Sequence, residues 1–280
     1  MVNDGPPGRP LRRVGFPLSL EQVTGRPTSS SPDLGEPIVT PSPQWHHPEA
    51  HFEESMRMRM VDQLRATQGF DARVLAVMAR VERHRFIDTA LASQAYVDTS
   101  LPIGLGQTIS KPSIIARMLS LLCQRPGVNA SGVTGARPLG RMLEIGTGCG
   151  YQATLLTELS REVYSVERLK LLFDRARNTM APIRAANLRL IYADGCWGHP
   201  PNAPYDGIVA AAACHGSVPS AWIDQLASGG RLVAPVYIPN QDRQILWVVD
   251  RLADHTLQEY GLEDVRFVPL ESGICDSGLS

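Results

Sequence analysis

A glycine-rich turn between a buried strand and a helix constrains this chain more than any other feature. The segment RMLEIG at 141–146 is apolar enough for a buried strand, and a helical pattern covers about 150–160, just after the letters TGCG. Gly146, Gly148 and Gly150 allow the backbone to turn tightly and to approach a ligand closely. The sequence therefore predicts the strand–turn–helix unit of a ligand-binding α/β domain.

Strands and helices continue to alternate after this unit. Further strands are predicted at 162–167, 188–194, 205–213 and 230–236, with helices over 169–181 and over the letters PSAWIDQLA. The C-terminal segments QILWVVDRL and DVRFVPL are predicted to be two more strands, antiparallel to the rest. Such alternation produces right-handed βαβ crossovers. The expected fold class is α/β: a doubly wound, Rossmann-like fold with a mostly parallel seven-stranded sheet and helices on both faces.

The chain before the first strand has several distinct parts. Residues 1–50 are rich in Pro, Gly and Ser and lack a period, which is typical of a disordered extension. Two helices are predicted next, over MRMRMVDQLRATQ and over ARVLAVMARV, the second with Asp71 as its N-cap. SIIARMLSLLC is a third, apolar helix, and 127–138 has the composition of a surface loop. We expect one domain over 51–280, with N-terminal helices and a loop at 51–123 and the Rossmann-like core at 139–270.

The net charge and the cysteine pattern of the chain indicate which classes of partner and which cellular compartment to expect. The net charge of -1 gives no broad electrostatic reason to bind nucleic acid or a membrane, and no apolar run reaches membrane-spanning length. The five cysteines form no C-x-x-C pair, which favours a reducing compartment, and the N-terminus lacks the apolar region of a secretory signal. His46, His47 and His51 belong to a polar tail, so no metal site is expected. We expect a cytoplasmic monomer.

Two acidic positions beyond the glycine-rich turn indicate what it binds. Glu167 ends the second strand, 21 residues after Gly146, where a carboxylate can accept from both hydroxyls of a ribose. Asp194 and Gly195 end the third strand and come to the same edge of the sheet. A dinucleotide site would need a small residue where Tyr151 stands, and the Gly-Lys-Ser/Thr of a phosphate-binding loop is absent.

The pattern is an acidic residue on the first strand (Glu144), the glycine-rich turn, a second acidic residue (Glu167) and then Asp194-Gly195. It fits S-adenosylmethionine, a nucleoside ligand without phosphate. The candidate cofactor-binding residues are Glu144, Gly146, Thr147, Gly148, Gly150, Glu167, Asp194 and Gly195. The alternative is a purely structural role, in which the glycines form an ordinary strand–helix turn and the acidic residues are solvated ends of strands.

The stretch LPIGLGQTISKP, Leu101 to Pro112, admits two interpretations. Ser110 followed by Lys111, Pro112 and an apolar helix has the pattern of a helix N-cap, and Thr108 suits a turn. Together with the downstream cofactor pattern, the same stretch becomes a candidate for the second half of an active site.

From about Met56 to about Leu270 the chain resembles the bacterial protein-L-isoaspartate O-methyltransferases. The matching segments are MVDQLRATQGFDARVLAVMARVERHRF, AYVDTSLPIGLGQTISKP, MLEIGTGCGYQATLLTEL, VYSVER, DG, QLASGGRLVAPV and FVPL. LPIGLGQTIS is specific to that family, whereas other methyltransferases share the glycine-rich motif.

This resemblance implies a Rossmann-like methyltransferase fold and a repair reaction. The methyl group of S-adenosylmethionine passes to the α-carboxylate of an L-isoaspartyl residue in a damaged protein, and the ester then closes to a succinimide. The resemblance places the catalytic serine at Ser110 and implies that Gln107, Thr108 and Ile109 lie where cofactor and substrate meet. Isoaspartyl proteins and peptides are the implied partners.

The residues of the stretch agree with a carboxylate acceptor. A carboxylate, with a reference pKa of about 4, is ionised at neutral pH and needs no general base. The absence of Asp, Glu and His from GLGQTIS is consistent with this. Lys111 stands where the bacterial pattern usually has Gln, and Glu82 where it has Pro, which leaves substrate preference open.

Two other functions remain compatible with the sequence. The chain could be an S-adenosylmethionine-dependent methyltransferase with a small-molecule or RNA acceptor, although its near-neutral charge and LPIGLGQTIS weigh against this. It could also be a non-catalytic module that binds altered peptides, against which the intact glycine turn, Glu167 and Ser110 weigh.

Overall fold

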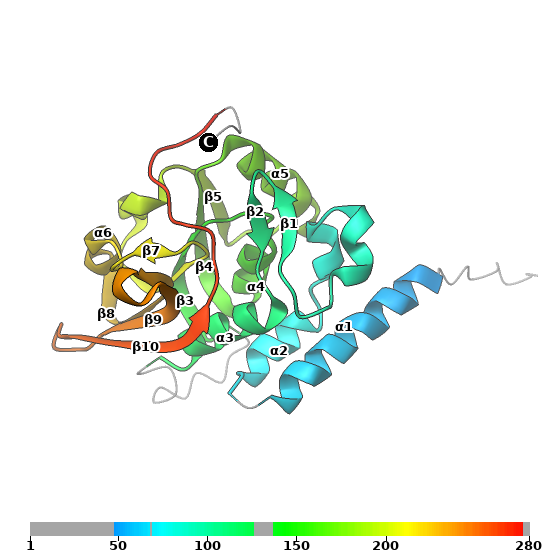
Figure 1. Cartoon of the computed structure of the whole chain (residues 1–280), viewed down its shortest axis with the longest axis horizontal. Coiled ribbons are helices and arrows are strands. Elements are labelled where there is room, and N and C mark those ends of the chain that lie inside the picture. The colour runs from blue at the N-terminus through cyan, green and yellow to red at the C-terminus, as the bar shows by residue number, and fades with distance from the viewer. Residues whose placement is uncertain (1–47, 68, 126–136, 277–280) are drawn as a thin grey trace, which may run out of the picture. The chain divides into compact units, whose positions relative to one another are not determined.

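A computed structural model describes residues 48–67, 69–125 and 137–276 (Figure 1). Most of the predicted extension at 1–50 and of the predicted loop at 127–138 therefore lies outside the described residues. The described residues fall within one compact unit of the chain, His46–Ser280. Among them, no helix combines the length and the apolar character that crossing a membrane requires.

The centre of the fold is a mostly parallel sheet whose main path has seven strands, as predicted. These are β3 (Leu139–Ile145), β4 (Ser160–Glu167), β5 (Leu188–Tyr192), β6 (Tyr205–Ala210), β8 (Leu226–Ile238), β9 (Arg243–Arg251) and β10 (Leu257–Val265). Their order is β10-β9-β8-β6-β3-β4-β5, and a two-residue strand, β7 (Cys214–His215), adds to β8. β9 is antiparallel to both neighbours, whereas β8, β6, β3, β4 and β5 are mutually parallel.

The connections between the parallel strands include α4 (Tyr151–Leu159), α5 (Lys170–Met180) and α6 (Ser220–Asp224). Because β4 and β5 lie on one side of β3 and β6 on the other, the strand order reverses at β3. Ligands of doubly wound sheets bind at such a point, outside the carboxyl ends of the strands.

Two predicted elements differ from the structure. The helix expected over PSAWIDQLA ends at Asp224, because Leu226 pairs with Tyr205 and begins β8. The last strand, expected over DVRFVPL, lies earlier in the chain, since β10 covers Leu257–Val265. The following segment bonds instead to the loop after β6: Ala213 N donates to Val268 O, and Leu270 N donates to Ala213 O.

The N-terminal part packs α1 (Pro48–Ala66), α2 (Ala72–Met78) and α3 (Pro112–Cys123) together, beside two 3₁₀ turns at Arg83–Phe86 and Thr89–Gln94. The predicted cap of α2 is confirmed, because the Asp71 side chain accepts from Arg73 N at 2.8 Å. Figure 1 shows α1 and α2 on the same side of the molecule as the β1–β2 hairpin, which consists of β1 (Leu101–Gly104) and β2 (Gln107–Ile109).

The sheet is buried on both faces. Met142, Val209 and Val233 belong to a core shared with α2, α3 and α4, whereas their neighbours Leu143, Ile208 and Leu232 face a second core. This alternation follows from the two-residue period of a strand. The second face is covered in part by the short helix α6, whose Trp222 is fully buried.

Candidate active site

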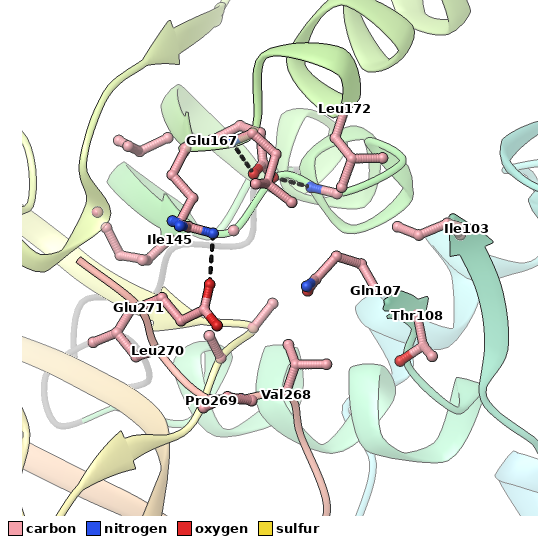
Figure 2. Close-up of a pocket in the computed structure, with 18 residues that line it drawn as sticks. Ile103, Gln107, Thr108, Ile145, Glu167, Leu172, Val268, Pro269, Leu270 and Glu271 are labelled. Carbon is pink, nitrogen blue, oxygen red and sulfur yellow. Dashed lines mark hydrogen bonds and ion pairs between the residues drawn. The ribbon is translucent and has the colours of Figure 1, made fainter. Parts of the chain in front are cut away.

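A cavity lies at the carboxyl ends of β3, β4 and β6 (Figure 2). Its volume is about 640 Å³, a figure that includes the part open to solvent. It is lined by Ile103, Gln107, Thr108, Ile145, Gly146, Gly148, Val166, Glu167, Arg168, Leu169, Leu172, Gly195, Ala211, Ala212, Val268, Pro269, Leu270 and Glu271. The glycine-rich turn and LPIGLGQTIS therefore meet at one cavity.

Glu167 is held rigidly at the cavity wall. Its Oε2 accepts from Gly148 N at 2.8 Å, and its Oε1 accepts from Leu169 N at 2.9 Å. Burial raises the pKa of this carboxyl above its ordinary value, against the opposing effect of those N–H groups. Two fixed backbone donors thus set the orientation of the carboxylate at the end of β4.

The glycine-rich turn needs glycine for two different reasons. Gly148 has a φ of +54°, and a Cβ there would lie 3.2 Å from Ile103 Cδ1 across the cavity. Gly150 has a φ of +90°, and a Cβ there would lie 2.5 Å from Met180 Sδ. Gly148 therefore keeps the cavity open, whereas Gly150 permits packing of α4 against α5 and does not line the cavity.

Two other predicted cofactor residues lie beneath the turn. Glu144 is fully buried and accepts from Ser165 Oγ, which also shares a hydrogen bond of 2.6 Å with Thr147 Oγ1. Burial raises the pKa of Glu144 to about 8. Neither Glu144 nor Thr147 lines the cavity, so their place in the structure is to tie the turn to β3 and β4.

The third predicted acid, Asp194, is also engaged by backbone groups. It accepts from Cys196 N at 2.8 Å and from Gly273 N at 2.7 Å. Burial alone would raise its pKa, but these N–H groups outweigh burial and lower it. Its neighbour Gly195 lines the cavity, whereas Asp194 fastens the C-terminal segment beside it.

Sequence reasoning missed the wall formed by 268–271. Val268, Pro269, Leu270 and Glu271 line the cavity together with the hairpin residues Gln107 and Thr108 (Figure 2). Glu271 forms an ion pair of 2.7 Å with Arg168 Nη1, which joins this wall to the residue after β4. A proline within DVRFVPL was the available signal, because proline cannot donate to a sheet ladder.

The stretch LPIGLGQTIS forms the β1–β2 hairpin rather than an open loop. Its tight turn places Leu105 and Gly106 at φ values of 53° and 69°. Gln107 and Thr108 reach the cavity, whereas Ile109 is 4% exposed and belongs to the hydrophobic core. The predicted substrate residues therefore divide between the cavity and the interior.

Ser110 lies in an adjacent groove between the end of the hairpin and the C-terminal segment. The groove is lined by Ser100, Thr108, Ser110, Lys111, Ile114, Asp264, Val265, Arg266, Phe267 and Val268. Thr108 and Val268 also line the cavity, so they form a shared wall.

The N-cap interpretation of Ser110 is wrong. Lys111 occupies the N-cap position of α3 without a side-chain hydrogen bond. The first turn of α3 is capped instead by Asp98, which lies outside the helix. Its carboxylate accepts hydrogen bonds from Ser113 N and Ser113 Oγ, both at 2.8 Å. Among the described residues, the Ser110 hydroxyl makes no hydrogen bond, and the Ser110 carbonyl accepts from Arg83 Nη2 at 2.7 Å.

The cavity fits S-adenosylmethionine in its chemistry. Apolar side chains of Val166, Leu169 and Leu172 surround one buried carboxylate, as a nucleoside with an uncharged base requires. The described residues contain no group of His, Cys, Asp and Glu that could hold a metal ion.

Comparison with known proteins gives consistent results. A protein-L-isoaspartate O-methyltransferase of Leptothrix cholodnii is 52% identical over 285 residues, covering 96% of this chain and 97% of the relative. Its counterpart in Methylibium petroleiphilum is 50% identical, covering 92% and 96%. A Plasmodium falciparum protein solved in complex with S-adenosyl-L-homocysteine shares the fold, with a TM-score of 0.62 at 22% identity over 78% of this chain and 98% of that chain.

The family model described as protein-L-isoaspartate(D-aspartate) O-methyltransferase matches residues 55–274. That range includes both the hairpin and the glycine-rich turn, and it spans most of the chain. The chain belongs to the protein-L-isoaspartate(D-aspartate) O-methyltransferase family.

Proposed function

We propose that this chain methylates the α-carboxylate of L-isoaspartyl residues, with Ser110 as the residue that orients the carboxylate. One observation carries the assignment to Ser110: its groove shares the wall formed by Thr108 and Val268 with the cavity. A carboxylate that enters from the groove thereby reaches the cavity past the Ser110 hydroxyl, which makes no hydrogen bond among the described residues.

The cavity residues take the cofactor roles. S-adenosylmethionine, when bound, supplies an electrophilic methyl group on a positively charged sulfur. Glu167 would accept hydrogen bonds from the ribose, and Gly146 and Gly148 would leave room for the amino-acid end. Gly195 would border the base, while Glu144, Thr147, Gly150 and Asp194 hold the surrounding backbone in place.

The groove residues position the acceptor without removing a proton. The acidic side chain in the described groove, Asp264, is ion-paired with Arg243 at 3.0 Å, which leaves no carboxylate aimed at Ser110. An isoaspartyl carboxylate is already ionised at neutral pH, so what it needs is orientation. The Ser110 hydroxyl would donate one hydrogen bond to it, and Gln107 and Thr108 would border the reacting groups.

We also propose that the protein is a cytoplasmic monomer that acts on isoaspartyl-containing proteins, without a nucleic-acid or membrane partner. The net charge of -1 gives no broad reason to bind nucleic acid or a membrane, and no disulfide links Cys123, Cys149, Cys196, Cys214 and Cys275, which agrees with a reducing compartment.

The test is methyl transfer from labelled S-adenosylmethionine to two peptides that differ in one linkage, aspartyl or isoaspartyl. Base-labile label on the isoaspartyl peptide alone is the expected result. Label on both peptides, or label on neither despite cofactor binding measured by calorimetry, would overturn the proposal. The last outcome would favour a peptide-binding module, and label on RNA or on a metabolite extract instead would identify another acceptor.

A further inference from the structure

The groove beside the cavity carries two cations that the reaction itself does not require. Lys111 lies at the start of α3, and Arg266 lies just after β10, so they come from the two segments that form the groove. Both side chains are exposed. Lys111 is also one of the two positions, with Glu82, at which the chain departs from the bacterial pattern that it otherwise resembles.

These cations have no protein partner within the described part of the chain. Neither Lys111 nor Arg266 forms an ion pair or a side-chain hydrogen bond there, although the chain contains many pairs elsewhere. Asp264, the acidic residue of the groove, is ion-paired with Arg243 at 3.0 Å. The neighbouring Glu263 is ion-paired with Arg117 at 2.8 Å. The remaining groove residues are uncharged, so the groove has an excess of positive charge.

The groove is also where the residues beside an isoaspartate must lie. Several hollows border the cavity, and this one contains Ser110. A substrate whose carboxylate reaches the shared wall of Thr108 and Val268 leaves its neighbouring residues along the groove. Their side chains then come close to Lys111 and Arg266.

We infer that Lys111 and Arg266 select isoaspartyl sites flanked by acidic residues. The inference rests on the proposed function and names the substrates that the same site prefers. An exposed ion pair changes binding by roughly 1.5- to 5-fold, and two such pairs act together. Charge complementarity at a groove also raises the rate of association, and salt weakens it.

Three isoaspartyl peptides test the inference, identical except for glutamate, glutamine or lysine at the two positions that flank the isoaspartate. The expected order of kcat/KM is glutamate, then glutamine, then lysine, with a glutamate-to-lysine ratio of roughly 5 to 20 at low ionic strength. The difference should lie mainly in KM. Raising the salt to about 0.5 M should shrink the ratio severalfold, because the Debye length falls to only a few ångströms.

Charge variants locate the effect. Lys111→Gln and Arg266→Gln should each lower the glutamate-to-lysine ratio about 2- to 4-fold, and the double variant should bring the ratio close to 1. Lys111→Glu combined with Arg266→Glu should invert the order. Arg161→Glu is the matched control: Arg161 is an exposed cation near the amino end of β4, the opposite edge of the sheet, and its loss should leave the ratio unchanged.

The results separate this inference from the proposed function. Methylation of the glutamine peptide with a glutamate-to-lysine ratio near 1 in the parent protein would show that the inference is wrong and that the function stands. The same conclusion would follow if Arg161→Glu altered this ratio as much as the groove variants do. If none of the three peptides is methylated, the proposed function itself fails. Circular dichroism and thermal melting of each variant establish that it is folded before its ratio is interpreted.

Discussion

The cavity and the groove share a wall, but they satisfy their polar groups in opposite ways. In the cavity, Glu167 is fixed by two backbone N–H groups, and Asp194 beside it is fixed by two more. In the groove, the Ser110 hydroxyl and the cations Lys111 and Arg266 have no partner among the described residues. If the cavity holds S-adenosylmethionine, as we propose, its ligand is the same in every turnover, and the site can be rigid in advance. Isoaspartyl proteins vary around one linkage, and a groove with free polar groups suits a variable ligand.

The first prediction concerns the cavity alone. Glu167→Gln removes the charge and replaces one carboxylate oxygen by an amide NH2 group, so one of the two backbone N–H groups now faces a donor and loses its acceptor. Hydrogen bonds to charged groups contribute about 1.5–3 kcal/mol, so we expect binding of S-adenosylhomocysteine to weaken roughly 10- to 100-fold. Calorimetry measures this directly.

Glu162→Gln is the control, because Glu162 lies at the opposite end of the same strand, where it pairs with Arg141 at 2.8 Å. It should leave the affinity unchanged. Equal weakening in both variants would mean that Glu167 acts on the stability of β4 rather than on the cofactor.

A second prediction concerns Arg83, which links the segment that carries Ser110 to the first residue of α4, Tyr151. Arg83 is fully buried, donates from Nε to Ala95 O at 2.8 Å and from Nη2 to Ser110 O at 2.7 Å, and lies 5.0 Å from the ring centroid of Tyr151. Arg83→Met leaves two carbonyls without a donor. We expect the free energy of unfolding in urea to fall by about 2–5 kcal/mol.

Arg83→Lys, which retains the charge and one donor, should lose less stability. In the folded fraction of the Arg83→Met protein, the rate of methyl transfer should fall more than the affinity for the cofactor. The reason is that the Ser110 carbonyl loses its hydrogen bond from Arg83. A proportional loss of both would show that the cavity and the groove are not separable.

A third prediction tests the support beneath the turn. The pKa of Glu144, about 8 in the folded protein, is above its ordinary value of 4.5 because the side chain is buried. Between those values the folded protein holds a proton that the unfolded chain has lost, so this group's contribution to stability falls as pH rises through the window. Glu144→Gln removes the titration and keeps an acceptor for Ser165 Oγ.

The free energy of unfolding of Glu144→Gln, relative to the parent, should therefore increase between about pH 5 and about pH 8 and stay level above that range. Urea titrations at several pH values measure it. If the free energies of unfolding of the two proteins change with pH in parallel, Glu144 is ionised in the folded state. Thr147 and Ser165 would then hold the turn beside a deprotonated Glu144.

The same contrast explains what could be predicted from the sequence. The strand–turn–helix unit and the position of Glu167 at the end of β4 are predictable because strand period, turn residues and spacing are local in the chain. The groove is not, because it joins 108–114 to 264–268, and only tertiary packing brings these segments together. The N-cap interpretation of Ser110 failed for a related reason: Asp98, fifteen residues before Ser113, satisfies the start of α3. Glu144 and Thr147 have the right spacing for cofactor residues, yet burial places them under the turn.

The division of roles between cavity and groove is tested most directly with Ser110→Ala. Cofactor affinity measured by calorimetry and methyl transfer to an isoaspartyl peptide, measured in a single turnover, should respond differently. We predict unchanged affinity for S-adenosylhomocysteine and a methyl-transfer rate lower by about 10²-fold, the loss expected when one oriented hydrogen-bond donor is removed. An unchanged rate, or a fall in affinity as large as the fall in rate, would contradict the account.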